Sequence, residues 1–197
     1  IGRLVGSEMC IRDSPRGDVI IEADWCIGEL IKSIENQDLL ENTLIILTSD
    51  NGPVLNDGYY DDAVAKIGNH DPKGGLRGGK YSLFEAGTNV PFITYWKGEI
   101  QSGISDQMIC QLDIFKSIAS LVNSKNNIQN DGQDLIDLMM GKDNNGRKSL
   151  VIEATTRTAY KKGNWVMIPP YKGPPIAKAV NIESVSYTHL TLPTSTH

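Results

Sequence analysis

The chain has 197 residues, of which 40% are hydrophobic and 22% charged, and its formal net charge is -5. A chain of this length and composition can bury a hydrophobic core, as a globular domain does. The acidic balance argues against a protein that follows a nucleic-acid backbone, and no apolar run reaches the roughly 18 residues of a membrane span. We therefore expect a globular protein with neither a nucleic-acid partner nor a membrane span.

The two ends of the sequence do not read as native protein. Residues 9–13, MCIRD, can be encoded by ATGTGTATAAGAGAC, and the reverse complement of that DNA encodes VSYTH, which is residues 185–189. The longer flanks LVGSEMCIRDS and SVSYTHLTLPT resemble translated sequencing-library adaptors read on opposite strands. We therefore expect residues 1–14 and 184–197 to be non-native and the rest to be a fragment of a longer protein. Two ordinary disordered tails are the alternative.

Without these ends, two cysteines, Cys26 and Cys110, and one histidine, His70, remain. Two cysteines without close spacing form neither a disulfide framework nor a zinc motif. We therefore expect both to be buried free thiols.

The first predicted elements are a helix and a strand. Apolar residues recur at intervals of three and four over residues 18–37, which predicts an amphipathic helix. Residues 43–48, TLIILT, form an apolar, β-branched run of strand length, typical of a parallel strand covered on both faces. A helix followed by a buried strand predicts an α/β layer structure.

The next part of the chain alternates loop and short elements. Residues 52–90 are rich in Gly, Asn and Asp without periodicity, which predicts one long loop of the kind that is usually functional or disordered. We then expect a strand over 91–96, an amphipathic helix over 111–123, and a helical turn over 134–141 that ends at its glycine.

The pattern of polar and apolar residues changes after residue 148. The segment SLVIEATTRTAYKKGNWVMI alternates in polarity, and a turn sequence lies at residues 162–164, so we predict that residues 150–160 pair with 165–168 as an antiparallel hairpin. The predicted organisation is therefore an α/β domain over 15–148 and the start of an antiparallel subdomain over 149–183, between the non-native ends 1–14 and 184–197.

Asp50 and Asn51 follow directly on the predicted strand at 43–48. In open α/β sheets, ligands bind beyond the carboxyl ends of the strands. A carboxylate and an amide oxygen are hard donors that suit calcium or magnesium. Asp-Asn-Gly-Pro is also a strong turn sequence, so a simple turn is the alternative.

A second group of candidate residues lies in KGGLRGGKYSLFEAGTNVP, residues 73–91. Its glycines let backbone amides, together with Arg77 and Lys80, approach one tetrahedral anion. The segment does not match the phosphate-loop pattern, and a solvated loop is the alternative. His70 precedes it as either a site or a structural residue. We expect Glu85 to anchor the loop, by a salt bridge or by accepting backbone amides.

Together, TLIILTSDNGP and LRGGKYSLFEAGTNVPFI resemble the C-terminal half of the catalytic domain of formylglycine-dependent sulfatases, in the alkaline phosphatase superfamily. The segments RGDVIIEADWCIGELIKSIE and RTAYKKGNWVMI also resemble parts of that family, so the resemblance covers residues 16–168. It implies part of a doubly wound, mostly parallel sheet with helices on both faces, followed by a small antiparallel subdomain.

The resemblance also implies an activity and roles for residues. The parent protein would be a sulfuric ester hydrolase acting on sulfate esters, with sulfated saccharides the expected class and aryl or other sulfate esters the alternative. Asp50 and Asn51 would ligate one calcium ion, with magnesium as the alternative, and Lys80 would contact the substrate sulfate. Arg77 and His70 have no family-wide role, and we expect them to line the pocket.

The resemblance implies that the other parts of the active site lie upstream. The family's nucleophile is a Cys or Ser in a C-x-P-S-R-like motif, converted to formylglycine, and neither Cys26 nor Cys110 has that context. We therefore expect this chain alone to be inactive. Relatives are usually periplasmic or secreted, but the fragment itself decides neither localisation nor oligomeric state.

Two other functions compete with this interpretation. One is a phosphatase, phosphodiesterase or phosphonate hydrolase of the same superfamily, which Asn51 disfavours because many of these proteins have a histidine there for a transition metal. The other is a non-catalytic module that binds sulfated glycans. The residue that would distinguish it, the nucleophile, does not occur in this chain.

Overall fold

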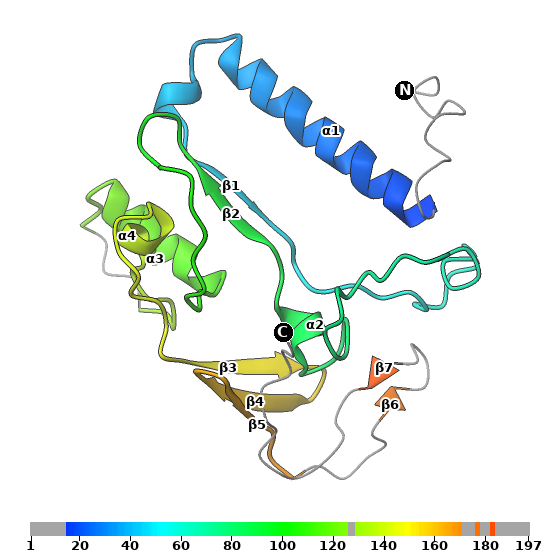
Figure 1. The fold of residues 1–197 in the computed structure, drawn as a ribbon. Helices are drawn as coiled ribbons and strands as arrows, with labels where there is room; N and C mark the ends of the chain where they lie inside the picture. The colour runs from blue at the N-terminus through cyan, green and yellow to red at the C-terminus, as the bar shows by residue number, and fades with distance from the viewer. Residues whose placement is uncertain (1–14, 126–128, 171–175, 178–181, 184–197) are drawn as a thin grey trace.

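The computed structural model describes residues 15–125, 129–170, 176–177 and 182–183 (Figure 1). The adaptor-like ends, 1–14 and 184–197, lie outside the described residues. The elements in chain order are α1 (Pro15–Glu35), the 3-10 helix η2 (Leu40–Asn42), β1 (Ile45–Thr48), α2 (Glu85–Thr88), β2 (Phe92–Tyr95), α3 (Leu112–Leu121), α4 (Ile136–Met139), β3 (Ser149–Ala154), β4 (Arg157–Lys162), β5 (Trp165–Met167), β6 (Ile176–Ala177) and β7 (Ile182–Glu183).

The predicted helix at the start of the native segment is confirmed as α1, but the described residues leave its apolar side chains largely uncovered. Val19, Trp25 and Leu30 are each more than half exposed, at 62%, 51% and 66%. The expectation of buried thiols is wrong for Cys26, which is exposed on α1, while Cys110 is partly buried; both are free. The spacing of apolar residues is enough to predict the helix, whereas the burial of its side chains depends on what packs against it.

Strands β1 and β2 form an antiparallel pair in which Ile45 lies opposite Tyr95 and Thr48 opposite Phe92. We expected the strand at 43–48 to run parallel to its neighbours. That expectation is wrong for β2, the strand that pairs with it in the described part of the chain. The same strand is only partly buried, not covered on both faces. An apolar run indicates that a strand has neighbours above and below, but it carries no information on the direction of the strand beside it.

Helices α3 and α4 pack against each other, and a buried carboxylate lies in the first turn of α3. Asp113, fully buried, accepts the backbone N–H groups of Cys110 and Gln133 at 2.9 and 2.7 Å. It also accepts Nε and Nη2 of Arg147 at 2.7 and 2.5 Å. These hydrogen bonds raise the pKa of the Arg147 guanidinium. They tie the start of α3 to the segment that leads into β3.

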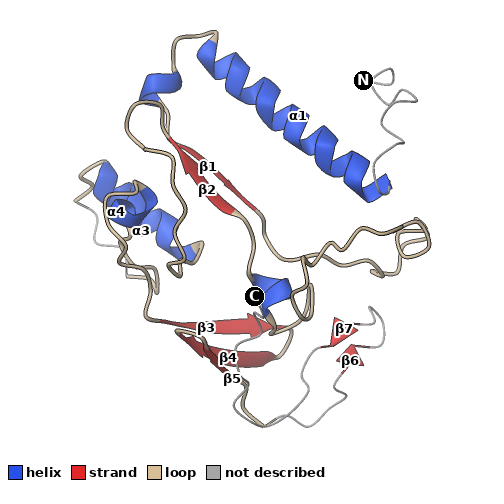
Figure 2. Ribbon diagram, in the orientation of Figure 1, coloured by secondary structure: helices blue, strands red, loops and turns tan. Residues whose placement is uncertain are grey.

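The predicted antiparallel region is a three-stranded sheet in the order β3–β4–β5 (Figure 2). The turn at Gly163 is confirmed, with φ of 54°, but the single long strand over 150–160 is wrong because the chain turns again at Thr155, where φ is 60°. A threonine in this left-handed conformation is uncommon, so its residue type does not predict a turn there. A short pair, β6–β7, follows.

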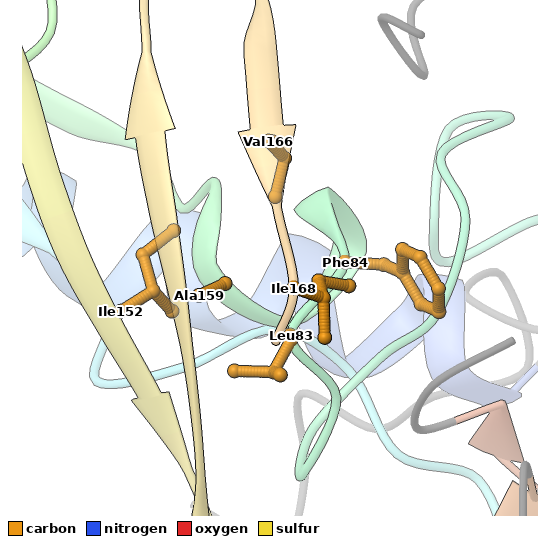
Figure 3. Packing of buried hydrophobic residues seen from close by; sticks show 6 residues of the cluster. All are labelled: Leu83, Phe84, Ile152, Ala159, Val166 and Ile168. Carbon is orange, nitrogen blue, oxygen red and sulfur yellow. The ribbon is translucent and has the colours of Figure 1, made fainter. Parts of the chain in front are cut away.

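The main hydrophobic cluster joins this sheet to the long loop (Figure 3). Leu83 and Phe84, from the end of the loop, are buried with four residues of the sheet and its C-terminal end, Ile152, Ala159, Val166 and Ile168. The predicted loop character of residues 52–90 is confirmed except for the short helix α2. Its last part is therefore fixed by packing, whereas Tyr59 and Tyr60, at 78% and 108% exposure, lie in its open part.

No helix in the described part of the chain is both long and apolar enough to cross a membrane.

We predict that Arg147→Met destabilises the protein by about 3–5 kcal/mol, because it leaves the buried Asp113 carboxylate without its counter-ion. The measurement is the free energy of unfolding in urea. Lys32→Met is the matched control, since Lys32 pairs with Glu29 at 2.6 Å on the exposed surface of α1, where such a pair contributes at most about 1 kcal/mol. Equal effects of the two substitutions would contradict the prediction.

Candidate functional site

The first part of the candidate site is the turn that follows β1, residues 49–53, here called the strand-end turn. The exposed Asp50 accepts the backbone N–H of Asn51 on Oδ1 at 2.9 Å. Asn51 donates its side-chain N–H to the carbonyl of Gly52 at 3.0 Å, which directs the amide oxygen away from that carbonyl. The segment is thus a turn, as its composition predicts, and the same turn presents two hard oxygen donors.

The second part is a closed backbone turn over residues 77–87, here called the glycine loop. The N–H of Ala86 donates to the carbonyl of Arg77 at 2.9 Å, and the N–H of Ser82 donates to Gly79 at 3.0 Å. The Arg77 guanidinium carbon lies 4.1 Å from the centroid of the Phe84 ring. This stacking holds the guanidinium against a buried ring and so limits its orientation.

The structure brings these two parts together through backbone hydrogen bonds. The N–H of Lys80 donates to the carbonyl of Pro53, and the N–H of Gly52 donates to that of Gly87, both at 2.9 Å. Because backbone groups make the contacts, the position of the Lys80 backbone is fixed relative to the turn that carries Asp50. The two motifs are far apart in sequence and adjacent in the fold.

Two glycines allow the close backbone packing of the site. A Cβ atom on Gly52 would lie 1.6 Å from the carbonyl oxygen of Ala86, and one on Gly87 would lie 2.3 Å from that of Gly79. Neither contact involves a side chain that can move aside. The close contact of the strand-end turn with the glycine loop therefore requires glycine at position 52, and the backbone packing inside the glycine loop requires glycine at position 87.

A strained backbone conformation lies beside Lys80. Tyr81 has φ of 70°, a left-handed conformation that costs an aromatic residue on the order of 1–3 kcal/mol. The Lys80 Nζ lies 5.4 Å from the centroid of the Tyr81 ring, within the range of a cation–π contact. The strained residue thus lies next to the lysine that the sequence singled out, and the surrounding hydrogen bonds maintain its conformation.

His70 lies in the long loop beside Asp71, away from the bonds that join the two parts of the site. Asp71 accepts the N–H groups of Lys73 and Gly75 at 3.0 and 2.7 Å, and these backbone hydrogen bonds lower the pKa of its carboxyl group. The Nε2 atom of His70 is buried and has no hydrogen-bond partner among the described residues. The structure does not connect His70 to Lys80, so its role stays a prediction.

Gln111 is a site neighbour that the sequence did not indicate. Its side-chain N–H donates to the carbonyl of Ser49 and, at 3.2 Å, to the hydroxyl of Thr48, so it braces the end of β1 from the start of α3. The partners are 62 and 63 positions apart in the chain. No local pattern signals such a contact.

The donor types at the strand-end turn fit part of a site for a hard cation. A carboxylate and an amide oxygen suit calcium or magnesium, but calcium takes about six to eight oxygen ligands. Within the residues that the structure describes, no group of three or more His, Cys, Asp or Glu side chains could hold a metal ion. Asp50 and Asn51 would therefore be two ligands of a set that needs further donors.

The sequence matches a family model described as Sulfatase over residues 13–124, more than half of the chain. The chain belongs to the sulfatase family. The resemblance found in the motifs, and the interpretation of the chain as part of a sulfatase, are thereby confirmed.

Named relatives agree with this assignment. An N-acetylgalactosamine-6-O-sulfatase of Bacteroides thetaiotaomicron is 40% identical over 164 residues, covering 82% of this chain and 32% of the relative. Human arylsulfatase A is 33% identical over 137 residues, covering 69% of this chain and 25% of the relative. The chain therefore spans about a quarter to a third of the length of these curated relatives.

Solved structures confirm the α/β fold class. A sulfatase from work on glycosaminoglycan metabolism by Bacteroides thetaiotaomicron superimposes with a TM-score of 0.85 at 37% identity, covering 92% of this chain and 38% of that one. The PsFucS1 sulfatase of a Pseudoalteromonas species gives a TM-score of 0.64 at 25% identity, covering 91% and 34%. The domain boundaries and the roles of individual site residues remain predictions.

We predict that Gly52→Ala separates the strand-end turn from the glycine loop and lowers the free energy of unfolding by about 1–3 kcal/mol, as overpacking does. Gly28→Ala is the matched control, because it lies in α1 with nothing within 4 Å of the added Cβ. It is expected to stabilise the protein by up to about 1 kcal/mol. Urea unfolding of both variants tests this, and a neutral Gly52→Ala would refute it.

Proposed function

We propose that this chain is part of an enzyme that hydrolyses sulfate esters, and that it contributes the residues of the glycine loop and the strand-end turn to the site. The observation that carries the proposal is the pair of backbone bonds that joins these two segments in a member of the sulfatase family. Through these bonds, the backbone of a cation-bearing loop lies next to the turn that carries a pair of hard oxygen donors.

Lys80 is the proposed catalytic residue of this chain. Its ammonium group would contact the sulfate and offset the negative charge that builds up on the sulfuryl oxygens, an electrostatic effect that is often the largest catalytic contribution. Arg77, on the same loop, would line the pocket with its guanidinium held over Phe84. His70 is proposed as a more peripheral pocket residue.

Asp50 and Asn51 are proposed as ligands of one calcium ion, with magnesium as the alternative. When bound, the ion would neutralise sulfuryl charge and orient the ester beside a formylglycine nucleophile supplied from outside this chain. The role of Asp50 and Asn51 is to fix two of the oxygen ligands at the end of β1. Since neither Cys26 nor Cys110 lies in a formylglycine motif, the 197-residue chain is proposed to be inactive by itself.

The proposed substrate is a sulfated saccharide. The support is the 40% identity to a protein named N-acetylgalactosamine-6-O-sulfatase. Aryl sulfates are the second class to assay, since human arylsulfatase A is also similar. An aryl phosphate distinguishes this function from that of a phosphatase of the same superfamily.

We predict that Lys80→Ala, in the full-length protein that contains this segment, lowers kcat/KM for a sulfate ester at least tenfold. That loss corresponds to about 1.4 kcal/mol of transition-state stabilisation. The measurement is steady-state hydrolysis of N-acetylgalactosamine 6-sulfate and of 4-nitrophenyl sulfate, with circular dichroism to check the fold.

Lys97→Ala is the matched control, because Lys97 is an exposed lysine that pairs with Glu41 at 3.6 Å. It is expected to retain wild-type kcat/KM. Near-normal activity of Lys80→Ala would contradict the assigned role, and turnover by the 197-residue chain alone would contradict its proposed inactivity.

We also predict that Asp50→Asn raises the calcium concentration needed for half-maximal activity by at least about tenfold, since it removes a charged oxygen ligand. After chelation, activity and the calcium-dependent rise in Tm are both measured as calcium is added back. Asp38→Asn is the control: Asp38 has φ of 56°, which asparagine also adopts. An unchanged calcium response in Asp50→Asn would remove Asp50 from the ligand set.

A further inference from the structure

The glycine loop is held from its far side by the C-terminal sheet. Leu83 and Phe84 are buried at 2% and 3% exposure against that sheet. Glu85, the next residue along the chain, begins α2 and forms an ion pair with Lys161 of β4, with 2.8 Å between Oε1 and Nζ. Figure 1 shows α2 close to the sheet, in agreement with these contacts.

Strand periodicity explains why Lys161 reaches this position. Successive side chains of a strand alternate between its faces, so Lys161 shares a face with Ala159, which lies in the hydrophobic cluster. On β5, Val166 of the same cluster lies directly opposite Lys161. A lysine on the core-facing side of a sheet needs a partner for its charge, and Glu85 provides one.

This pair is less buried than the Asp113–Arg147 pair, but its burial distinguishes it from the ion pairs on the protein surface. The side chains of Lys161 and Glu85 are 24% and 18% exposed, against 46% and 79% for Lys97 and Glu41. Water screens the Glu85–Lys161 pair less, so the attraction between its charges is stronger than in a surface pair.

The ion pair lies at the closure of the glycine loop. Ala86 follows Glu85 and donates the hydrogen bond to Arg77 that closes the loop, and Gly87 accepts the hydrogen bond from Gly52. Lys80 lies between these closing contacts and is followed by the strained Tyr81. A strained conformation persists only where the surrounding contacts enforce it, and here the contacts on one side come from the sheet.

We propose that Glu85 and Lys161 are positioning residues for Lys80: their ion pair fixes the glycine loop on the C-terminal sheet and so holds the lysine at the strand-end turn. The inference rests on the proposed function in the part that concerns turnover. The antiparallel sheet is thereby assigned a part in the site, although it contributes none of the side chains proposed to touch the substrate.

The test compares Lys161→Met, which removes the charge, with Lys161→Arg, which keeps it, in the full-length protein that contains this segment. Lys161→Met is expected to lower kcat about five- to tenfold with little change in KM, because a small misplacement of a catalytic group is costly in rate. Lys161→Arg is expected to retain most of the activity. Glu41→Gln, which breaks the exposed pair with Lys97, is expected to have no effect.

A double-mutant cycle separates positioning from general stability. In a Lys80→Ala background, adding Lys161→Met is expected to cause no further loss of kcat, since the two changes act through one group. The same loss in both backgrounds would overturn the inference, as would full activity of Lys161→Met.

Hydrogen exchange provides a readout that does not depend on turnover. The backbone amides of Ser82, Ala86 and Gly87 are hydrogen-bonded within the loop, and that of Lys80 is hydrogen-bonded to Pro53 of the strand-end turn. They are expected to exchange faster in Lys161→Met, while amides of β1 keep their wild-type rates. Unchanged exchange in the loop would overturn the inference. If the wild-type protein hydrolyses no sulfate ester, the proposed function fails, and the exchange experiment still decides whether the ion pair holds the loop.

Discussion

The arrangement of the candidate site depends on one close backbone contact, that of Gly52 with Ala86 and Gly87. A hydrogen bond from Gly52 to Gly87 joins the strand-end turn to the glycine loop, and a Cβ on Gly52 would lie 1.6 Å from the Ala86 carbonyl oxygen. Since no side chain intervenes, the separation of the two segments is set by van der Waals contact between backbones. Lys80 and the oxygen donors of Asp50 and Asn51 derive their relative placement from this constraint.

The contact is supported on both sides by parts of the chain that carry no proposed chemistry. Gln111 braces the end of β1 by hydrogen bonds to Thr48 and Ser49. On the other side, Leu83 and Phe84 anchor the glycine loop in the cluster shared with the β3–β4–β5 sheet. The sheet thus contributes to the site through packing and through the Glu85–Lys161 ion pair. The residue types of the sheet do not by themselves predict this role.

The rest of the structure is consistent with a portion of a larger sulfatase fold. The buried Asp113–Arg147 pair links α3 to the segment that leads into β3. By contrast, α1 and the outer face of α3, where Phe115 and Val122 are 50% and 65% exposed, present apolar side chains that the described residues leave open. The related sulfatase structure with a TM-score of 0.85 matches 92% of this chain, but the match covers only 38% of that structure.

Local physics explains what the sequence by itself determined. Apolar spacing predicted α1, β1, β2 and α3, and residue chemistry identified Asp50, Asn51 and Lys80 as candidates, because helix period, strand composition and donor type are properties of short segments. The motifs together also indicated the sulfatase family. The tertiary structure alone decided the antiparallel direction of β2 beside β1, the turn at Thr155, the exposure of Cys26, and the contacts of Gln111 and Lys161. Each of these depends on groups distant in sequence, whose approach leaves no mark on the local pattern of residues.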